Sequence, residues 1–250
     1  MTSSEARGNS VFITGATSGI GKETTALFLA KGWRVLATAR TDTQAIKLRE
    51  EFNYPDFEVI TCEVHIEESC QSAIKRVLEL VPSGPNVIVN NAGFALPGAI
   101  EDVELQDAEH QLDTNLLAPA RFIQGFLPLM RKHGEGRIIN ISSVSGLVAM
   151  PFIGWYSASK FGLEAISDAL RVELMDTRIQ IVIIEPTSFA SNIWSKASNQ
   201  MPSTQSHQDH YKSADRIINA RYPAPTAVAQ AIYEAATSSN PKHRYLVGKQ

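Results

Sequence analysis

Ser10-Val-Phe-Ile-Thr-Gly-Ala-Thr-Ser-Gly-Ile-Gly21 is the stretch of sequence that decides the fold. It begins with a short apolar run, Ser10 to Thr14, that predicts a strand, and helical patterning follows from Lys22 to Lys31. The residues between them predict a glycine-rich turn. Such a turn brings backbone N–H groups and the positive end of a helix dipole close to a phosphate. Because the spacing differs from G-x-G-x-x-G, both pyrophosphate binding and a purely structural turn are open.

The rest of the chain alternates short apolar runs with segments of helical periodicity. Further strands are expected at 34–38, 58–63, 86–90, 136–142, 180–185 and 245–247, and helices at 43–53, 67–80, 105–132, 154–175 and 226–237. This alternation implies right-handed crossovers and a parallel sheet. We therefore predict an α/β fold in a single domain over 1–250, a doubly wound Rossmann sheet of about seven strands with helices on both faces.

The composition is that of an ordinary globular protein, since 44% of the 250 residues are hydrophobic and 20% are charged. A net charge of −3 gives no overall attraction to nucleic acid or to acidic membranes. The two cysteines, Cys62 and Cys70, fit neither a disulfide framework nor a metal cluster, so we expect reduced intracellular thiols. The sequence has no apolar signal core and no convincing transmembrane segment, and we expect a cytoplasmic protein.

Tyr156-Ser-Ala-Ser-Lys160 is the stretch that indicates catalytic chemistry. Four residues along a helix are about 6 Å of rise and roughly 40° of rotation, so the phenol and the ammonium share one face. A phenol with a pKa of about 10 needs a shift of roughly 3 units, or about 4 kcal/mol, to work near neutrality. A lysine charge about 4 Å away in a shielded site supplies an interaction of that order. Alone, the pair could also simply line an amphipathic helix.

Two further polar residues stand where a dinucleotide site would need them. Arg40 ends the second strand, where an acid would favour a free ribose 2′-hydroxyl and an arginine can pair with a 2′-phosphate. It indicates NADP(H) over NAD(H), unless it is only a solvated surface arginine. Asn115 lies in an apolar helical run and is expected either to tie the backbone of a neighbouring strand or to hold water, and the sequence alone favours the structural role. Pro119 predicts a local distortion of the helix.

The segment 187–222 mixes apolar residues with polar spacers and has no strong period. We expect it to form a mobile lid over the site. Within it, His207 and His210 could form a metal-binding pair, but no cysteine and no defined carboxylate supports one. We therefore expect solvated loop histidines and no metal site.

Together the motifs resemble the short-chain dehydrogenase/reductase family across essentially the whole chain. The matching residues, in order and at family-like separations, are Thr14-Gly15-x3-Gly19-x-Gly21, Asn90-Asn-Ala-Gly93, Asn115, Ser143 and Tyr156-x3-Lys160. The family's catalytic serine stands 13 positions before the tyrosine, which selects Ser143 rather than Ser142.

The resemblance implies an NADP(H)-dependent oxidoreductase in which Tyr156 exchanges a proton with the substrate oxygen and Ser143 hydrogen-bonds that oxygen. Lys160 would lower the pKa of Tyr156 and grip the nicotinamide ribose, and Asn115 would hold a water that links Lys160 to solvent. Hydride would pass directly between the nicotinamide and the substrate carbon. The cofactor-binding residues that the resemblance implies are Gly15, Thr17, Ser18, Gly19, Ile20, Gly21, Arg40, Glu63, Val64, Asn91, Ala92, Gly93, Tyr156, Lys160, Pro186 and Ser191.

Three positions depart from the family pattern. Cys62-Glu63-Val64 stands where Asp-Val is usual, so Glu63 is expected to keep the carboxylate role with a longer reach. Pro186-Thr187 replaces the usual Pro-Gly, and because a β-branched residue avoids positive φ, the loop near the nicotinamide is expected to follow a different path. Ser191 is the nearest match to the threonine that often caps the carboxamide end.

Within the family, the run 156–174 and the ending Arg244-Tyr-Leu-Val-Gly248 are most similar to 17-beta-hydroxysteroid dehydrogenases, retinol dehydrogenases and acyl-dihydroxyacetone phosphate reductases. This branch implies an apolar ketone or aldehyde, or the corresponding alcohol, as the small-molecule substrate. Either a substrate pocket or core and subunit contacts would account for Phe94, Leu96, Val148, Met150, Phe152 and Trp155. The resemblance also implies a homodimer or homotetramer formed through the helices 105–132 and 154–175.

Two other functions compete with the reductase. One is an NADP-binding regulatory or sensor protein that keeps the fold without turnover, but a protein relieved of catalysis has no chemical need for Ser143, Tyr156 and Lys160 together. The other, more remote, is nucleic-acid binding, for which the chain lacks a basic stripe with interleaved aromatic residues.

Overall fold

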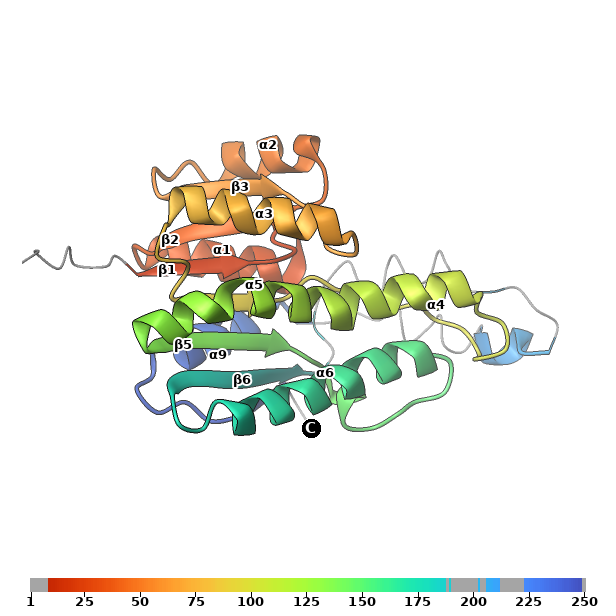
Figure 1. Cartoon of the computed structure of the whole chain (residues 1–250). Helices are drawn as coiled ribbons and strands as arrows, with labels where there is room; N and C mark the ends of the chain where they lie inside the picture. The colour runs from red at the N-terminus through yellow and green to blue at the C-terminus, as the bar shows by residue number, and fades with distance from the viewer. Residues whose placement is uncertain (1–8, 188, 190–201, 203–205, 212–222, 249–250) are drawn as a thin grey trace, which may run out of the picture.

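The computed structural model of the chain describes residues 9–187, 189, 202, 206–211 and 223–248. All neighbouring strands run parallel in one sheet of seven, in the order β3-β2-β1-β4-β5-β6-β7 (Figure 1). The strands are β1 (Ser10–Ile13), β2 (Arg34–Ala39), β3 (Phe57–Thr61), β4 (Val87–Asn90), β5 (Glu135–Ile141), β6 (Arg178–Pro186) and β7 (Arg244–Val247). The predicted Rossmann sheet is thus confirmed, and its order reverses between β1 and β4, where such sheets bind ligands.

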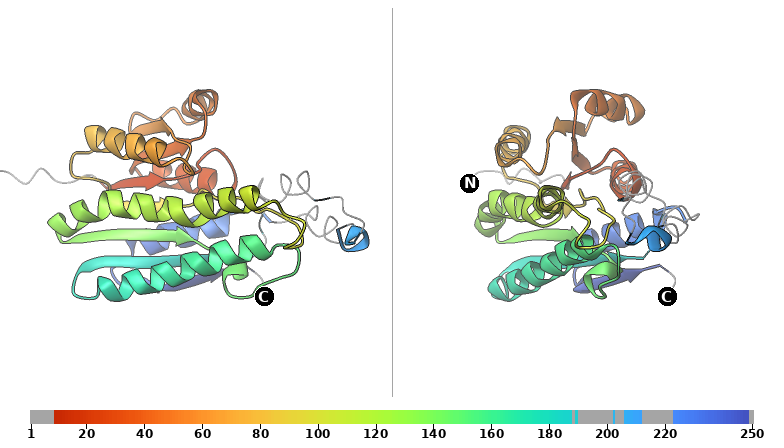
Figure 2. Two further views of the ribbon diagram at one scale, coloured as in Figure 1. Left: turned by 45° about the vertical axis from the view of Figure 1, so that its right-hand side comes forward. Right: turned by 90° about the vertical axis from the view of Figure 1, so that its right-hand side faces the viewer.

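Helices cover both faces of the sheet (Figures 1 and 2). The buried clusters assign α1 (Gly19–Ala30), α2 (Asp42–Glu51) and α9 (Thr226–Thr237) to one face and α3 (Glu67–Leu80), α5 (Ala118–His133) and α6 (Gly154–Glu173) to the other. A further helix, α4 (Leu105–Leu112), and the first turns of α6 extend past the carboxyl ends of the strands (Figure 1). No helix in the described part of the chain is long and apolar enough to cross a membrane.

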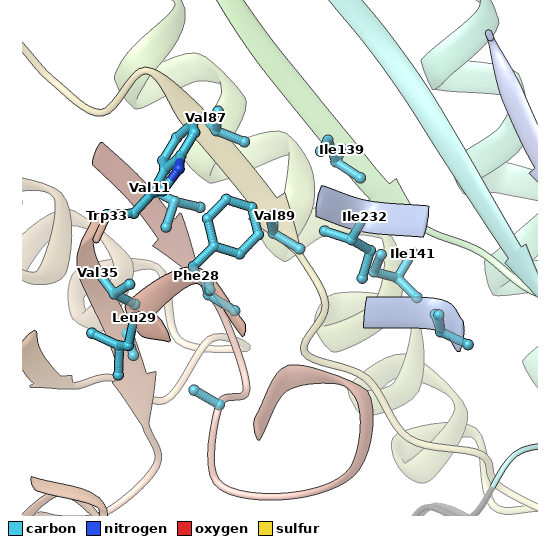
Figure 3. Close-up of a cluster of buried hydrophobic side chains, with 14 of the residues drawn as sticks. Val11, Phe28, Leu29, Trp33, Val35, Val87, Val89, Ile139, Ile141 and Ile232 are labelled. Carbon is cyan, nitrogen blue, oxygen red and sulfur yellow. The ribbon is translucent and has the colours of Figure 1, made fainter. Parts of the chain in front are cut away.

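Alternating side chains of the central strands build the two layers of the core. Val11 and Ile13 of β1 pack in one cluster with Phe28 of α1 and Ile232 of α9, part of which is drawn in Figure 3. Phe12, between them in sequence, points to the opposite face and packs with the aromatic rings of α5. Because both faces are covered, the strands read as continuous apolar runs and the polar groups collect at their ends.

The first helix begins at Gly19, whereas the sequence predicted a start at Lys22. The first helical turn consists of Gly19, Ile20 and Gly21, and glycine has too low a helix propensity for a pattern to reveal it there. The correction matters for function. The free N–H groups of the first turn belong to the glycine-rich turn itself, rather than to the residues that follow it.

The long helical stretch predicted at 105–132 is broken by one π-helical turn, Asp113–Leu117, between α4 and α5. Pro119 has no N–H and cannot bond to the carbonyl of Asn115, four residues earlier. The chain widens at this point and Asn115 is fully buried. The distortion that the sequence predicted from Pro119 is therefore present.

Candidate active site

The turn after β1 can be built only with glycine at its critical positions. Gly15 and Gly19 have φ of 69° and 54°, in the left-handed region where side chains are strained. A Cβ on Gly15 would lie 2.8 Å from Ala92 Cα, and one on Gly21 would lie 2.3 Å from the Gly15 carbonyl oxygen. The turn therefore packs backbone against backbone and keeps the N-terminus of α1 open.

The N-terminus of α1 suits a phosphate. Ser18, its N-cap residue, makes no side-chain hydrogen bond to the first turn, and the first turn carries no acidic residue. The N–H groups there remain free to donate, and the positive end of the helix dipole favours an anion. The residues present thus fit the pyrophosphate of a dinucleotide.

A set of hydrogen bonds fastens the segment after β4 to the glycine turn. The side chain of Asn91 donates to the carbonyl oxygens of Thr14 (2.8 Å) and Gly15 (3.1 Å). The hydroxyl of Thr14 accepts from the N–H groups of Asn91 and Ala92 at 3.0 and 2.9 Å. Because all of these groups are partly or fully buried, the two cofactor-facing segments form one rigid support.

A cavity of about 340 Å³ opens along the carboxyl ends of the strands. It runs from Arg40, after β2, past the glycine turn to Tyr156 and Lys160 on α6. The residues predicted from the sequence that line it are Gly15, Thr17, Ser18, Gly19, Ile20, Arg40, Val64, Asn91, Ala92, Gly93, Ser143, Tyr156, Lys160 and Pro186. One continuous cavity thus brings together groups from the ends of six strands, as an extended dinucleotide requires.

Four predicted site residues do not line this cavity as described. Gly21 lies beneath the turn, and Asn115 lies behind Gly93, where its Oδ1 would be 3.0 Å from a Cβ added to that glycine. Glu63 is not part of the lining, but its Oε2 lies 3.8 Å from Nε2 of the lining residue His65. Ser191 falls outside the described residues.

Ser143, Tyr156 and Lys160 meet at the inner end of the cavity, and each is at most 8% exposed. Ser143 follows β5, and its side chain is hydrogen-bonded to that of Tyr156. Lys160 donates from Nζ to the carbonyl oxygen of Ile141 at 2.8 Å, and the same Nζ lies 5.7 Å from the centre of the Tyr156 ring. The predicted triad is therefore assembled in one place.

Burial is the largest cause of the pKa shifts of Tyr156 and Lys160. It raises the pKa of Tyr156 to about 12, and the hydrogen bond from Ser143 acts in the opposite direction. Burial also lowers the pKa of Lys160 to about 8, partly offset by the negative charge of Glu164. The shift of Tyr156 is opposite to the lowered pKa that we expected from the sequence, because desolvation of the phenolate is its largest cause.

Asn115 holds the backbone of the segment after β4. Its Oδ1 accepts from the Phe94 N–H at 3.0 Å, and its Nδ2 donates to the Phe94 carbonyl at 2.9 Å and to Ser159 Oγ at 3.0 Å. Of the two roles open from the sequence, the structure contains the structural one. Asn115 fixes Phe94 and Gly93 against α6 through Ser159.

The loop after β6 accommodates Thr187 without strain. Phe152, with φ of 62°, is the one non-glycine residue with positive φ in the described part of the chain, so Thr187 avoids that region. The Thr187 N–H continues the sheet ladder by donating to the Val247 carbonyl at 2.8 Å. Its side chain occupies the space beside Gly248, where an added Cβ would be 1.8 Å from Thr187 Oγ1. Thr187 thus shapes the end of the cavity that it lines.

The described part of the predicted lid packs on neighbouring loops. Tyr211 accepts a hydrogen bond from the Ala99 N–H at 2.9 Å, and His207 Nε2 lies 2.8 Å from Glu101 Oε1. The rings of His207 and His210 both contact Phe152. Across the residues that the structure describes, no group of three or more possible ligands is placed to hold a metal ion. Most of 187–222 lies outside the described residues, so its role as a lid stays a prediction.

Sequence reasoning missed a dozen lining residues: Thr38, Ala39, Gln44, Cys62, His65, Ala95, Asp107, His110, Thr114, Ile141, Ser142 and Phe189. Thr38 and Ser142 are the last residues of the strands predicted at 34–38 and 136–142, and the rule that ligands bind at the carboxyl ends of parallel strands could have found them. Asp107 and His110 lie on α4, and only the three-dimensional path of that helix brings them to the cavity. Of the predicted apolar substrate residues, Phe94 and Leu96 line the cavity, whereas Val148 is 65% exposed and lies outside it.

Comparisons with known proteins agree with this geometry. A family model described as short chain dehydrogenase matches residues 9–202. The NADPH-dependent 3-dehydrocapnine reductase of Ornithobacterium rhinotracheale is 34% identical over 247 residues, which cover 94% of this chain and 86% of that protein. Human retinol dehydrogenase 16 is 34% identical over 263 residues, covering 98% and 82%. The crystal structure of a short-chain dehydrogenase from Streptomyces avermitilis superposes with a TM-score of 0.86 at 26% identity, covering 97% of this chain and 89% of that one.

Proposed function

Because the chain belongs to the short-chain dehydrogenase family, we propose that it is an NADP(H)-dependent oxidoreductase that reduces an apolar ketone or aldehyde to the alcohol. The observation that carries the proposal is the convergence of Ser143, Tyr156 and Lys160 on a cavity that also contains the glycine turn. A phenol, a hydroxyl and an ammonium in this arrangement suit proton transfer to a carbonyl oxygen.

Tyr156 is the proton donor. Its pKa of about 12 keeps the phenol protonated near neutral pH, which is the state needed to protonate the oxygen of a carbonyl as it is reduced. When bound, NADPH supplies the hydride. The raised pKa therefore favours reduction over oxidation, since oxidation would first require the buried phenol to lose its proton.

Ser143 and Lys160 support the donor. Ser143 hydrogen-bonds the phenol and can share that interaction with a substrate oxygen beside it. Lys160 presents a buried cation close to the ring, and its remaining donors are available to a ribose hydroxyl. We propose that Asn115 acts by positioning, because its amide is committed to Phe94 and Ser159, and that a water between Asn115 and Lys160 is the route for proton resupply.

The preference for NADP(H) rests on Arg40. It is exposed at the rim of the cavity after β2, and among the described residues no carboxylate lies within ion-pair distance of its guanidinium. A free guanidinium at the strand end can pair with a 2′-phosphate, as the sequence suggested. A relative whose name states dependence on NADPH supports this choice.

The proposal of an apolar substrate rests on three apolar residues of the cavity lining. Phe94, Leu96 and Phe189 line the cavity with apolar side chains. Retinol dehydrogenase 16, by its name, acts on an apolar alcohol, which supports a hydrophobic carbonyl compound as the substrate class. Two exposed apolar residues on α6, Phe161 and Val172, support the proposal of a homodimer or homotetramer. Location in the cytoplasm is proposed from the sequence.

The test is the consumption of NADPH, followed by its absorbance, with a panel of apolar ketones and aldehydes. Wild type and Tyr156→Phe are compared, and NADH is run in parallel. We expect turnover with NADPH that disappears in the variant while cofactor binding, followed by fluorescence, is retained. Tight NADPH binding with no turnover across the panel would instead favour a regulatory or sensor protein.

A further inference from the structure

Two histidine rings lie in contact at the rim of the cavity near Arg40, tilted by 50° to each other, and the proposed function gives them no role. His65 follows β3 and His110 lies on α4, and their ring centroids are 4.3 Å apart. Both side chains and Arg40 line the same cavity. The ring of Phe94 also contacts that of His110, with centroids 5.1 Å apart.

The charged groups around this pair come from four segments. Arg40 faces it from the end of β2, Asp107 from the preceding turn of α4, and Asp113 from the π-helical turn. The carboxylate of Glu63 lies 3.8 Å from His65. Asp113 is held by Arg121, with Nη2 to Oδ1 at 2.8 Å, and so is largely neutralised.

Proton binding by the two imidazoles reverses the local charge. With both rings neutral, Glu63 and Asp107 together outweigh the single positive charge of Arg40. With both rings protonated, the cations outnumber the two carboxylates. The site thus attracts an anion when both rings carry protons and disfavours one when neither does.

In the protein alone, this second state is disfavoured. Burial lowers the pKa of His110, and the nearby His65 and Arg40 lower it further, while Asp107 and Asp113 raise it. A phosphate monoester carries up to two negative charges, with a second pKa of about 6, and it would offset the repulsion between the rings. Binding of such a group should therefore draw protons onto the pair.

We propose that His65 and His110, together with Arg40, bind the 2′-phosphate of NADP(H), and that they make this binding tighten as the pH falls. The inference rests on the proposed function, because it takes the end of the cavity at Arg40 as the adenosine end. It adds two residues that determine cofactor specificity, His110 on α4 and His65 in the loop after β3, to Arg40 at the end of β2.

The test uses two fragments of the cofactor, 2′,5′-ADP and 5′-AMP, which differ only in the 2′-phosphate. Their affinities are measured by titration calorimetry at about pH 6 and about pH 8, in two buffers of different ionisation enthalpy, so that proton uptake is counted directly. For wild type we expect 2′,5′-ADP to bind roughly tenfold more tightly at the lower pH, relative to 5′-AMP, with additional proton uptake.

The variants His65→Gln and His110→Gln separate this effect from the protonation of the phosphate itself. Each should lose most of the pH dependence and roughly tenfold in 2′,5′-ADP affinity at the lower pH, with little change for 5′-AMP. His243→Gln, an exposed histidine at the other edge of the sheet, is the matched control and should behave as wild type. Thermal unfolding confirms that each variant is folded.

Two outcomes would overturn the inference. Equal losses for both ligands would mean that the rings pack against the base, and unchanged variants would mean that they take no part. If Arg40→Gln abolishes the preference for 2′,5′-ADP while both histidine variants keep it, the inference fails and the proposed function stands. If wild type binds the two fragments equally at both pH values, the inference fails together with the preference for NADP(H).

Discussion

Asn115→Ala is the substitution whose effect can be worked most fully from the structure. The change removes three hydrogen bonds, two to the backbone of Phe94 and one to Ser159. The Phe94 carbonyl keeps a partner, because Gln111 Nε2 also donates to it at 3.0 Å, and Ser159 keeps its bond to the Tyr156 carbonyl. The Phe94 N–H is the group left without its partner.

The lost bonds and the stranded N–H together give a loss of about 2 to 4 kcal/mol in the free energy of unfolding. For a domain of this size that corresponds to a fall in melting temperature of roughly 5 to 15 °C. The assay is equilibrium unfolding in urea, followed by circular dichroism. Asn53→Ala, at an exposed asparagine, is the control and should change stability by less than about 0.5 kcal/mol.

A loss below about 1 kcal/mol for Asn115→Ala would refute this reasoning. It would mean that the amide is not needed to hold the segment after β4, and that the role of Asn115 lies in the water that the family resemblance implied. Loss of activity with unchanged stability would point the same way.

Three further predictions follow from the site. Arg40→Asp should raise the Michaelis constant for NADPH far more than that for NADH, and equal changes for both would contradict the role of Arg40. Because the pKa of Tyr156 is raised to about 12, the rate of alcohol oxidation should rise with pH, up to about tenfold per unit above neutrality. The rate of carbonyl reduction should not change over the same range. An oxidation rate that levels off near neutral pH would show that the phenol ionises there. Gly248→Ala should destabilise the fold by about 2 kcal/mol or more, since the added Cβ would collide with Thr187 and the backbone has a φ of 128°. Adding Thr187→Gly to the same chain should recover part of the lost stability in urea unfolding. No recovery would exclude that contact as the cause.

Local patterns were enough to predict the sheet and the core of the site. Apolar runs located all seven strands within a few residues, because strands buried on both faces leave a continuous signal. The glycine turn and the spacing from Tyr156 to Lys160 depend on short-range geometry, and they led to residues that the structure brings to one cavity. These features depend on residues that are close together in the sequence, so they can be predicted from one sequence.

The features that the sequence did not predict depend on contacts between distant segments. His65 and His110 are 45 positions apart in the sequence, and only the path of α4 over the cavity brings their rings into contact. The direction of the Tyr156 pKa shift follows from complete burial, which the spacing to Lys160 does not reveal. Glu63 was expected at the cofactor; it is not part of the cavity lining, and its carboxylate lies 3.8 Å from His65, which is.

The central claim, direct hydride transfer from NADPH with Tyr156 as the proton donor, is tested most directly by isotope transfer. NADPH carrying deuterium at the transferable position of the nicotinamide is incubated with an apolar ketone that wild type turns over, and the alcohol is analysed by mass spectrometry and NMR. We predict one deuterium on the carbinol carbon with wild type and no labelled alcohol with Tyr156→Phe. Alcohol without deuterium at that carbon, or undiminished labelling in the variant, would contradict the account.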